Sequence, residues 1–309
     1  MADYYAYKTI NSIEYGFKLD EHNHPFATVL NSDTWDNVIT VESHIDGVPV
    51  TVIGEYAFRH CRHINDAILP DTIAIIEPSA FEASGIRSIT IPDSVTKIGS
   101  FAFHDCKNLE KINFGNGLKC ISNCAFASCN KLKEIIFPAS LETLFLSAVE
   151  ACEKLEHIHF DGDCFEFNDG DYMGLAYKCP ELKYITTSPS NTRYVAVDNV
   201  LYDYKKKSLV RIPQASKSTN FTLPKWVEHC ENNSFFNIPK LKTVTVRQKD
   251  IKNFQAAGWH TTHITKFRCD SSSNVGQIIK KKHIDIFEAS SNLNDFLDDI
   301  KAKSEDKNI

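Results

Sequence analysis

Apolar positions along this chain repeat at intervals of 22 or 23 residues, and an Ala-Phe pair marks most of the repeats. An aliphatic residue lies four positions before each marker, and a Cys lies four positions after it, except where Ser84 takes that place. The first residues of the marker pairs are Ala57, Ala80, Ala102, Ala125 and, in an Ala-Val pair, Ala148. A fixed period in the twenties predicts stacked units that bury one shared core.

The pattern inside one repeat predicts strands and turns rather than a long helix. Over residues 109–114, apolar side chains alternate with Lys111 and Asn113, which places these two on the outer face of a strand. A proline recurs near the middle of each unit, and a proline inside a helix costs about 3 kcal/mol. We therefore expect a strand, a proline turn, a short extended segment over 95–98 and a tight helical turn over 102–106.

Residues 91–112 read I-P-x-S-V-x-x-I-G-x-x-A-F-x-x-C-x-x-L-x-x-I, a pattern that resembles the BspA-like leucine-rich repeat family at every position. The resemblance extends over about residues 50–267. It implies a mainly β, right-handed leucine-rich repeat solenoid with coils of 22–23 residues, parallel strands on its concave face and short helical turns. Many members of that family are surface proteins implicated in adhesion or host interaction, so the resemblance also implies an interaction role.

The repeat divides the chain into three parts. Residues 1–48 show strand-like alternation and predict an N-terminal β cap, because an uncapped solenoid exposes its core and a strand edge. Residues 49–267 are predicted to form the solenoid. Residues 268–309 predict a C-terminal helix and a polar tail. One helical face in this last part carries Leu293, Phe296, Leu297 and Ile300.

Two insertions interrupt the repeat. Residues 161–174 form an acidic loop, and repeat insertions often map to function. Residues 192–204 predict a β-hairpin, since two β-rich runs flank Asp198-Asn199 and both turn residues tolerate a positive φ.

Composition narrows the classes of partner. The 309 residues carry a formal net charge of −6 and no basic block with interleaved aromatic residues, which disfavours nucleic acid. No apolar stretch is long enough to span a membrane. The N-terminal sequence lacks the features of a signal peptide, so we expect a cytoplasmic protein if Met1 is the native start and a surface protein if a leader was removed.

The ten cysteines are expected to be mostly reduced and structural. Five of them occupy the same repeat position, where stacking predicts a buried ladder of small apolar groups: Cys61, Cys106, Cys129, Cys152 and Cys179. A zinc site at Cys120, Cys124 and Cys129 is disfavoured, because no second pair of ligands follows at a suitable spacing.

No catalytic motif appears: the chain has no G-x-S-x-G, no P-loop and no H-E-x-x-H. We therefore expect no enzyme activity, no cofactor and no bound metal. The acidic loop has too few correctly spaced carboxylates for a calcium-binding loop.

Strand alternation also predicts which side chains the coils present together on the concave face. The candidate partner-binding patch combines apolar, aromatic and titratable residues: Glu134, Ile136, His157, His159 and Tyr184. Large amphipathic side chains on a rigid surface are typical of binding sites. The alternative is that the two histidines are polar residues of a solvated strand.

The sequence favours a non-enzymatic, monomeric interaction module of adhesion or scaffold type that binds a protein, or a glycan, through its concave strand face. Two alternatives stay open. One is a structural spacer in a surface assembly. The other is a metal-dependent hydrolase that uses His157, His159 and the acidic loop.

Overall fold

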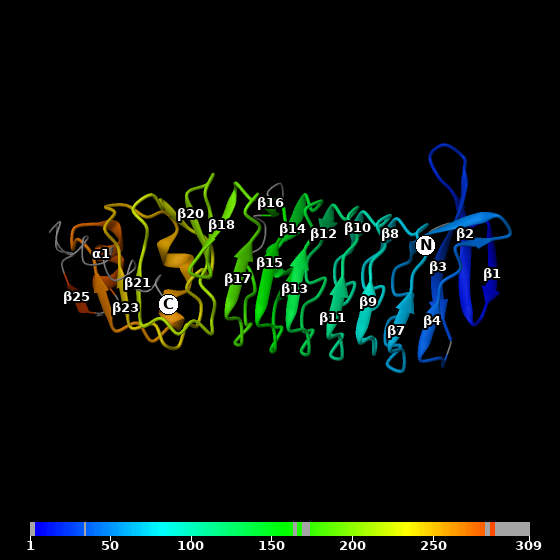
Figure 1. Ribbon diagram of the computed structural model, residues 1–309, viewed down its shortest axis with the longest axis horizontal. Helices are drawn as coiled ribbons and strands as arrows, with labels where there is room; N and C mark the ends of the chain where they lie inside the picture. The colour runs from blue at the N-terminus through cyan, green and yellow to red at the C-terminus, as the bar shows by residue number, and fades with distance from the viewer. Residues whose placement is uncertain (1–3, 34, 163–165, 169–173, 282–284, 288–309) are drawn as a thin grey trace.

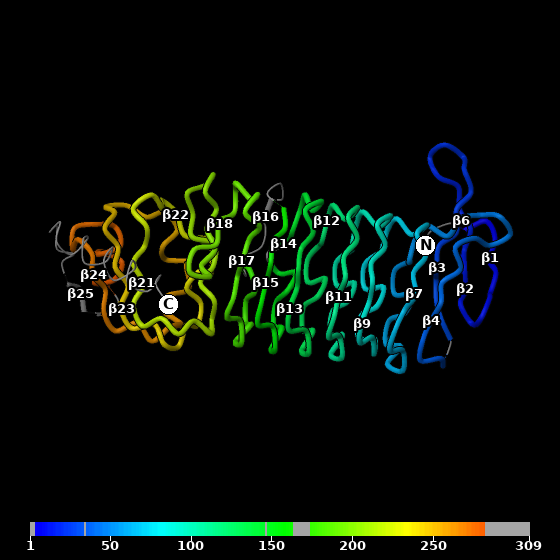
Figure 2. The backbone as a smooth tube through the Cα atoms, in the orientation of Figure 1, coloured from blue at the N-terminus to red at the C-terminus, as the bar shows by residue number. Residues whose placement is uncertain are grey.

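The repeats stack into an elongated β-solenoid, with the N-terminal strands at one end (Figure 1). The computed structural model describes residues 4–33, 35–162, 166–168, 174–281 and 285–287. The backbone tube in Figure 2 shows successive coils lying side by side along the long axis. The helical face predicted over 293–300 and most of the acidic loop lie outside the described residues.

The longer strand of each coil lies beside that of the next coil, in the same direction. These repeat strands are β4 (Val38–Thr40), β7 (Asp66–Ile68), β9 (Ser88–Thr90), β11 (Lys111–Asn113), β13 (Glu134–Phe137), β15 (His157–Phe160), β17 (Tyr184–Thr187), β21 (Asn220–Thr222), β23 (Thr243–Thr245), β24 (Lys266–Arg268) and β25 (Asp285–Phe287). We call the surface formed by their outward side chains the strand face.

The repeat strands do not form one continuous sheet on this face: the described strands form three hydrogen-bonded groups. They are β4–β7–β9–β11, β13–β15–β17 and β21–β23–β24–β25. Between β17 and β21 the chain is diverted into the inserted hairpin, which packs against β17. Between β11 and β13 the coils stay in contact, with the rings of Phe114 and Phe137 stacked 6.2 Å apart.

A second sheet runs along the other side of the solenoid, and the sequence predicted only its extended segments. Its solenoid strands are β6 (Val48–Ile53), β8 (Ile75–Ile76), β10 (Lys97–Ile98), β12 (Cys120–Ile121), β14 (Thr143–Phe145) and β16 (Glu166–Asn168), with β5 (His44–Ile45) on β6. At the N-terminal end the antiparallel strands β1 (Ala6–Ile10), β2 (Ile13–Leu19) and β3 (Pro25–Ser32) extend it, and β3 pairs in parallel with β6. The N-terminal strands therefore cover the end of the solenoid core with paired backbone.

The Ala-Phe markers hold successive coils together. The phenylalanine N–H of one coil donates to the alanine carbonyl of the next, as from Phe81 to Ala102 and from Phe103 to Ala125, both at 2.7 Å. The phenylalanine rings stack in a column with centroids 5.0–5.2 Å apart, which runs through Phe58, Phe81, Phe103 and Phe126. Glycine is needed at position 99, where this turn begins, because a Cβ there would lie 2.5 Å from the backbone nitrogen of Pro78.

The cysteine ladder is present, and its thiols are also hydrogen-bond donors. Sγ of Cys106 and of Cys129 donate to the carbonyls of Phe81 and Phe103 in the preceding coil, at 3.0 and 3.2 Å. Burial raises the pKa of the Cys106 thiol to about 12. The expectation that Cys61 is buried is wrong: this first member of the ladder is only half-buried, since no earlier coil of the ladder covers it.

Burial predicts a two-stage reaction of the thiols with a thiol reagent. In the native protein the half-buried Cys61, Cys120 and Cys124 should react first, while the ladder cysteines Cys106 and Cys129 stay protected. After unfolding, titration should count close to the ten cysteines of the sequence. A count of two or fewer after unfolding would contradict the assignment of free, structural cysteines.

The inserted hairpin joins two parts of the hydrophobic core. Strands β18 (Tyr194–Val197) and β19 (Val200–Asp203) are antiparallel, and their turn residues Asp198 and Asn199 both have positive φ. Strand β20 (Ser208–Arg211) follows and pairs with β19, and β22 (His229–Cys230), which comes after β21 in the chain, pairs in parallel with β20. The described helices are short: η1 (Leu146–Val149), η2 (Phe254–Ala257), η3 (Trp259–Thr261) and α1 (Asn274–Lys280).

Arg211, at the end of β20, lies fully buried at the seam between the coils before and after the hairpin. Its guanidinium donates to the carbonyl of Ala176 at 3.2 Å and to the carbonyl of Asn233. Burial lowers the pKa of Arg211 to about 10. One side chain thus connects two coils that are far apart in the sequence.

Candidate functional site

The strand register brings the predicted patch residues together on three adjacent strands. Glu134 of β13 lies opposite His157 of β15, and His157 lies opposite Tyr184 of β17. Two residues further along the same strands, Ile136 lies opposite His159. The sequence-based adjacency follows from parallel, in-register coils.

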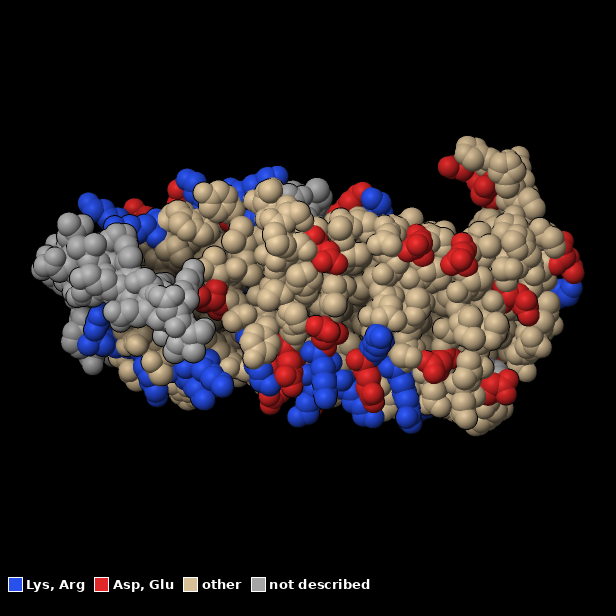
Figure 3. All heavy atoms as spheres, viewed as in Figure 1, with Lys and Arg blue, Asp and Glu red and all other residues tan. Residues whose placement is uncertain are grey.

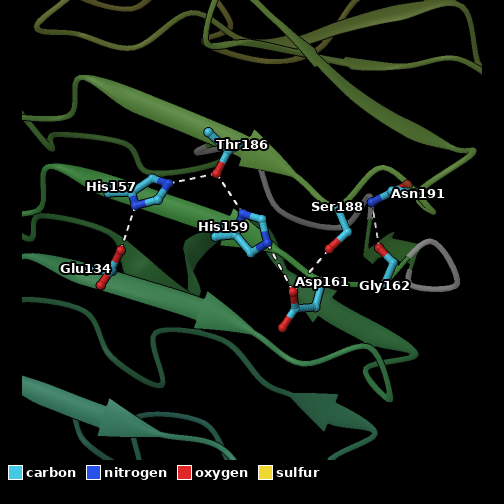
Figure 4. A network of polar contacts seen from close by, with 8 residues as sticks. All are labelled: Glu134, His157, His159, Asp161, Gly162, Thr186, Ser188 and Asn191. Atoms are coloured by element: carbon cyan, nitrogen blue, oxygen red, sulfur yellow. Dashed lines mark hydrogen bonds and ion pairs between the residues drawn. The ribbon is translucent and has the colours of Figure 1, made fainter.

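Inside this patch, side chains form a continuous chain of polar contacts across the coils (Figure 4). His157 Nδ1 lies 2.7 Å from Glu134 Oε1, and His157 Nε2 lies 2.7 Å from Thr186 Oγ1. Thr186 Oγ1 also lies 2.7 Å from His159 Nδ1, and His159 Nε2 lies 3.1 Å from Asp161 Oδ1. The two histidines therefore share one hydroxyl on one side, and each faces a carboxylate on the other.

The sequence prediction missed the residues that join the network. It gave Thr186 no role, and it assigned Asp161 to the acidic loop. Ser188, beyond the end of β17, donates its hydroxyl to Asp161 at 3.1 Å. Strand alternation could have placed the Thr186 side chain on the outer face beside the histidines. Its contacts with both of them depend on side-chain rotamers, which the sequence pattern does not specify.

Two apolar side chains flank the network and remain available to solvent. Ile136 is 45% exposed and Tyr184 is 50% exposed. The ring of Tyr184 meets the ring of His157 edge-on, with centroids 6.2 Å apart. The histidine side chains are less exposed, at 29% for His157 and 23% for His159. The patch thus has apolar edges and a fixed polar centre.

Charges of alternating sign lie along one border of the strand face (Figure 3). In the residue before each repeat strand the side chains are Arg87, Glu110, Lys133, Glu156 and Lys183 in successive coils. Glu156 and Lys183 form an ion pair at 2.9 Å, and the hydrogen bond from Lys183 lowers the pKa of Glu156. Because positive and negative groups alternate, this border does not present a large field of one sign.

A hollow of about 710 Å³ adjoins the patch on its N-terminal side. Its lining includes Ile136 and Glu134 of the patch together with Ile112, Asn113 and Lys133. Charged side chains make up most of the remaining lining, so the hollow is a mainly charged concavity with Ile112 and Ile136 as its apolar residues.

Among residues 4–33, 35–162, 166–168, 174–281 and 285–287, no set of three His, Cys, Asp or Glu side chains is placed to hold a metal ion. Every helix in the same residues is too short or too polar to cross a bilayer.

Solved structures with the same architecture come from several bacteria. A leucine-rich repeat protein from Bacteroides ovatus has a TM-score of 0.63 at 22% identity, covering 85% of this chain and 70% of that one. A leucine rich cell surface protein from Faecalibacterium prausnitzii has a TM-score of 0.55 at 19% identity, covering 95% and 97%. The pneumococcal vaccine antigen PcpA has a TM-score of 0.55 at 17% identity, covering 88% and 68%. At these identities the likeness shows the fold alone.

The search of curated proteins gave no significant match. The family model described as the BspA type leucine rich repeat region matches six copies over residues 51–176 and 213–297, which leaves out the inserted hairpin. The chain belongs to the BspA type leucine-rich repeat family.

Proposed function

We propose that this protein is a non-enzymatic interaction module of adhesion or scaffold type that binds a protein partner through the strand face. The contact patch is centred on Glu134, Ile136, His157, His159 and Tyr184. The observation that carries the proposal is the exposure of Ile136 and Tyr184 on either side of a side-chain network that spans three coils.

Exposed apolar anchors favour a macromolecular partner over a purely structural role. Elsewhere on the strand face most outward residues are small and polar, such as Ser88, Thr90 and Thr243, while Val38 of β4 and Ile68 of β7 are apolar and exposed near the N-terminal end. Truncating a central aromatic or aliphatic anchor usually costs an interface more than 1 kcal/mol, whereas most rim residues contribute little. The patch supplies two such anchors within three adjacent strands.

The network supports the same proposal because it lowers the cost of binding. Side chains that are fixed before contact lose less conformational entropy when the partner arrives. Each ring nitrogen of His157 and of His159 lies within 3.1 Å of a side-chain oxygen from a neighbouring residue. The polar centre is therefore arranged in advance while Ile136 and Tyr184 provide contact area.

The proposal predicts that the Ile136→Ala and Tyr184→Ala variants bind a purified partner about 1–3 kcal/mol more weakly each. This corresponds to roughly 5- to 150-fold in Kd. The partner is first captured from cells of the source organism or its host, and affinity is then measured by calorimetry or surface plasmon resonance. Melting temperatures should stay near that of the wild type, since outward side chains contribute little to the core.

The matched control is the double variant Thr243→Ala and Thr245→Ala, which alters outward positions of β23 on the same face. This control should bind like the wild type. Undiminished affinity in a folded His157→Ala, His159→Ala and Tyr184→Ala triple variant would instead move the binding site away from the patch. A solenoid that serves only as a spacer would show no specific partner that distinguishes these variants.

A further inference from the structure

The two histidines of the network present a pair of ring nitrogens to the same point. His157 Nε2 and His159 Nδ1 each lie 2.7 Å from the hydroxyl oxygen of Thr186 (Figure 4). They come from alternate residues of β15, so both rings stand on the same face of one strand. Such nitrogens are the atoms through which imidazole binds transition metals.

The carboxylates on the far side of the rings fix which nitrogens carry hydrogen. A carboxylate accepts hydrogen bonds only, so His157 Nδ1 must donate to Glu134 and His159 Nε2 must donate to Asp161. In neutral rings the other two nitrogens then have lone pairs, and both lone pairs face Thr186. The hydroxyl has one hydrogen and can satisfy only one of them.

One of the two inner nitrogens is therefore left without a hydrogen to accept, and a cation between the two rings would satisfy it. A proton on one ring would do this, and so would a metal cation that both nitrogens bind. The surroundings suit a metal ion, because each imidazole already has the outer partner typical of metal-bound histidine. In such sites the far N–H of the ring donates to a carboxylate, which fixes the tautomer and raises the basicity of the ligand. Here both rings have this arrangement, with Glu134 and Asp161 as the outer partners.

We infer that His157 and His159 form a binding site for a divalent late transition metal ion such as Zn²⁺. The ion would be bonded to His157 Nε2 and His159 Nδ1, with the Thr186 hydroxyl and water as further oxygen ligands. Zinc–nitrogen bonds of about 2.0–2.1 Å are shorter than the present 2.7 Å contacts to the hydroxyl. Binding would therefore require the Thr186 hydroxyl to move from its place between the two nitrogens, and the partly exposed rings leave the site open to solvent.

The ligand set also determines which cations bind. Imidazole nitrogen suits Zn²⁺, Cu²⁺ and Ni²⁺, whereas Ca²⁺ and Mg²⁺ prefer oxygen ligands. The carboxylates of Glu134 and Asp161 face the far nitrogens and do not converge on Thr186. The site therefore discriminates against the hard cations. This inference does not rest on the proposed function, since metal binding is measured on the isolated chain.

The test is equilibrium dialysis or calorimetry of the full chain with Zn²⁺. We expect the wild type to bind one zinc ion that the folded His157→Gln and His159→Gln double variant does not bind. Glu134→Gln should weaken this binding about 10- to 100-fold, the usual effect of losing an outer partner. Calcium in excess should not displace the zinc.

The control is the double variant His22→Gln and His24→Gln, which removes another pair of histidines two residues apart. Their rings are 6.3 Å apart and each lies near a carboxylate, but both are well exposed. Zinc binding that is lost in this control but kept in the His157 and His159 variant would overturn the inference. Absence of zinc binding to the wild type would also overturn it, and would leave a proton as the cation between the two rings.

Discussion

Replacing Phe103 with alanine is expected to lower the free energy of unfolding by about 3–5 kcal/mol. The ring is fully buried and stacks between Phe81 and Phe126, at 5.0 and 5.2 Å. Its loss leaves a cavity in the middle of the ring column, and each neighbouring coil loses a contact. Urea denaturation followed by circular dichroism gives the change in stability.

Phe101→Ala is the matched control, since it removes the same side chain two residues away. Phe101 is 42% exposed and has a positive φ of 60°, which alanine would share. Its replacement should change stability by no more than about 0.5 kcal/mol. Equal losses in the two variants would contradict the role of the ring column as the core of the coils.

Replacing Arg211 with alanine is expected to cost about 3–5 kcal/mol, because two effects combine. The carbonyls of Ala176 and Asn233 both lose the guanidinium donor, although that of Asn233 keeps the N–H of Phe236. Leaving the buried carbonyl of Ala176 without this donor costs about 1–3 kcal/mol. The truncation also leaves a cavity at a fully buried position. The midpoint of urea unfolding measures the combined loss.

Arg211→Met separates the two effects. Methionine fills much of the volume but donates no hydrogen bond, and it removes a charge that is costly to bury. We expect this variant to recover part of the loss seen with alanine. A loss below about 1 kcal/mol in Arg211→Ala would show that the guanidinium does not hold the coils on the two sides of the hairpin together.

The repeat made much of the architecture predictable. A period of 22 or 23 residues with a constant marker places equivalent residues in equivalent environments, so Ala102 and Phe103 could be assigned to the core. The same logic placed Glu134 beside His157 and Ile136 beside His159. Alternation within a strand then decided which of these side chains face outward.

Structural features that do not recur from coil to coil could not be predicted in the same way. Arg211 belongs to the insertion, where no equivalent residue exists in other coils, and its carbonyl acceptors are 35 and 22 residues away. The division of the strand face into three groups depends on small displacements between coils and on the hairpin packed against β17. The shared hydroxyl of Thr186 depends on rotamers. Such features come from tertiary geometry and have no local pattern.

The most direct test of the proposed binding surface is site-specific photocrosslinking. A photoreactive amino acid is placed at position 184 in the patch, or at position 243 on β23 as the control on the same face. The account predicts that the partner crosslinks from position 184 and gives little or no product from position 243. Efficient crosslinking from position 243 with none from position 184 would contradict the claim that the partner binds at the patch.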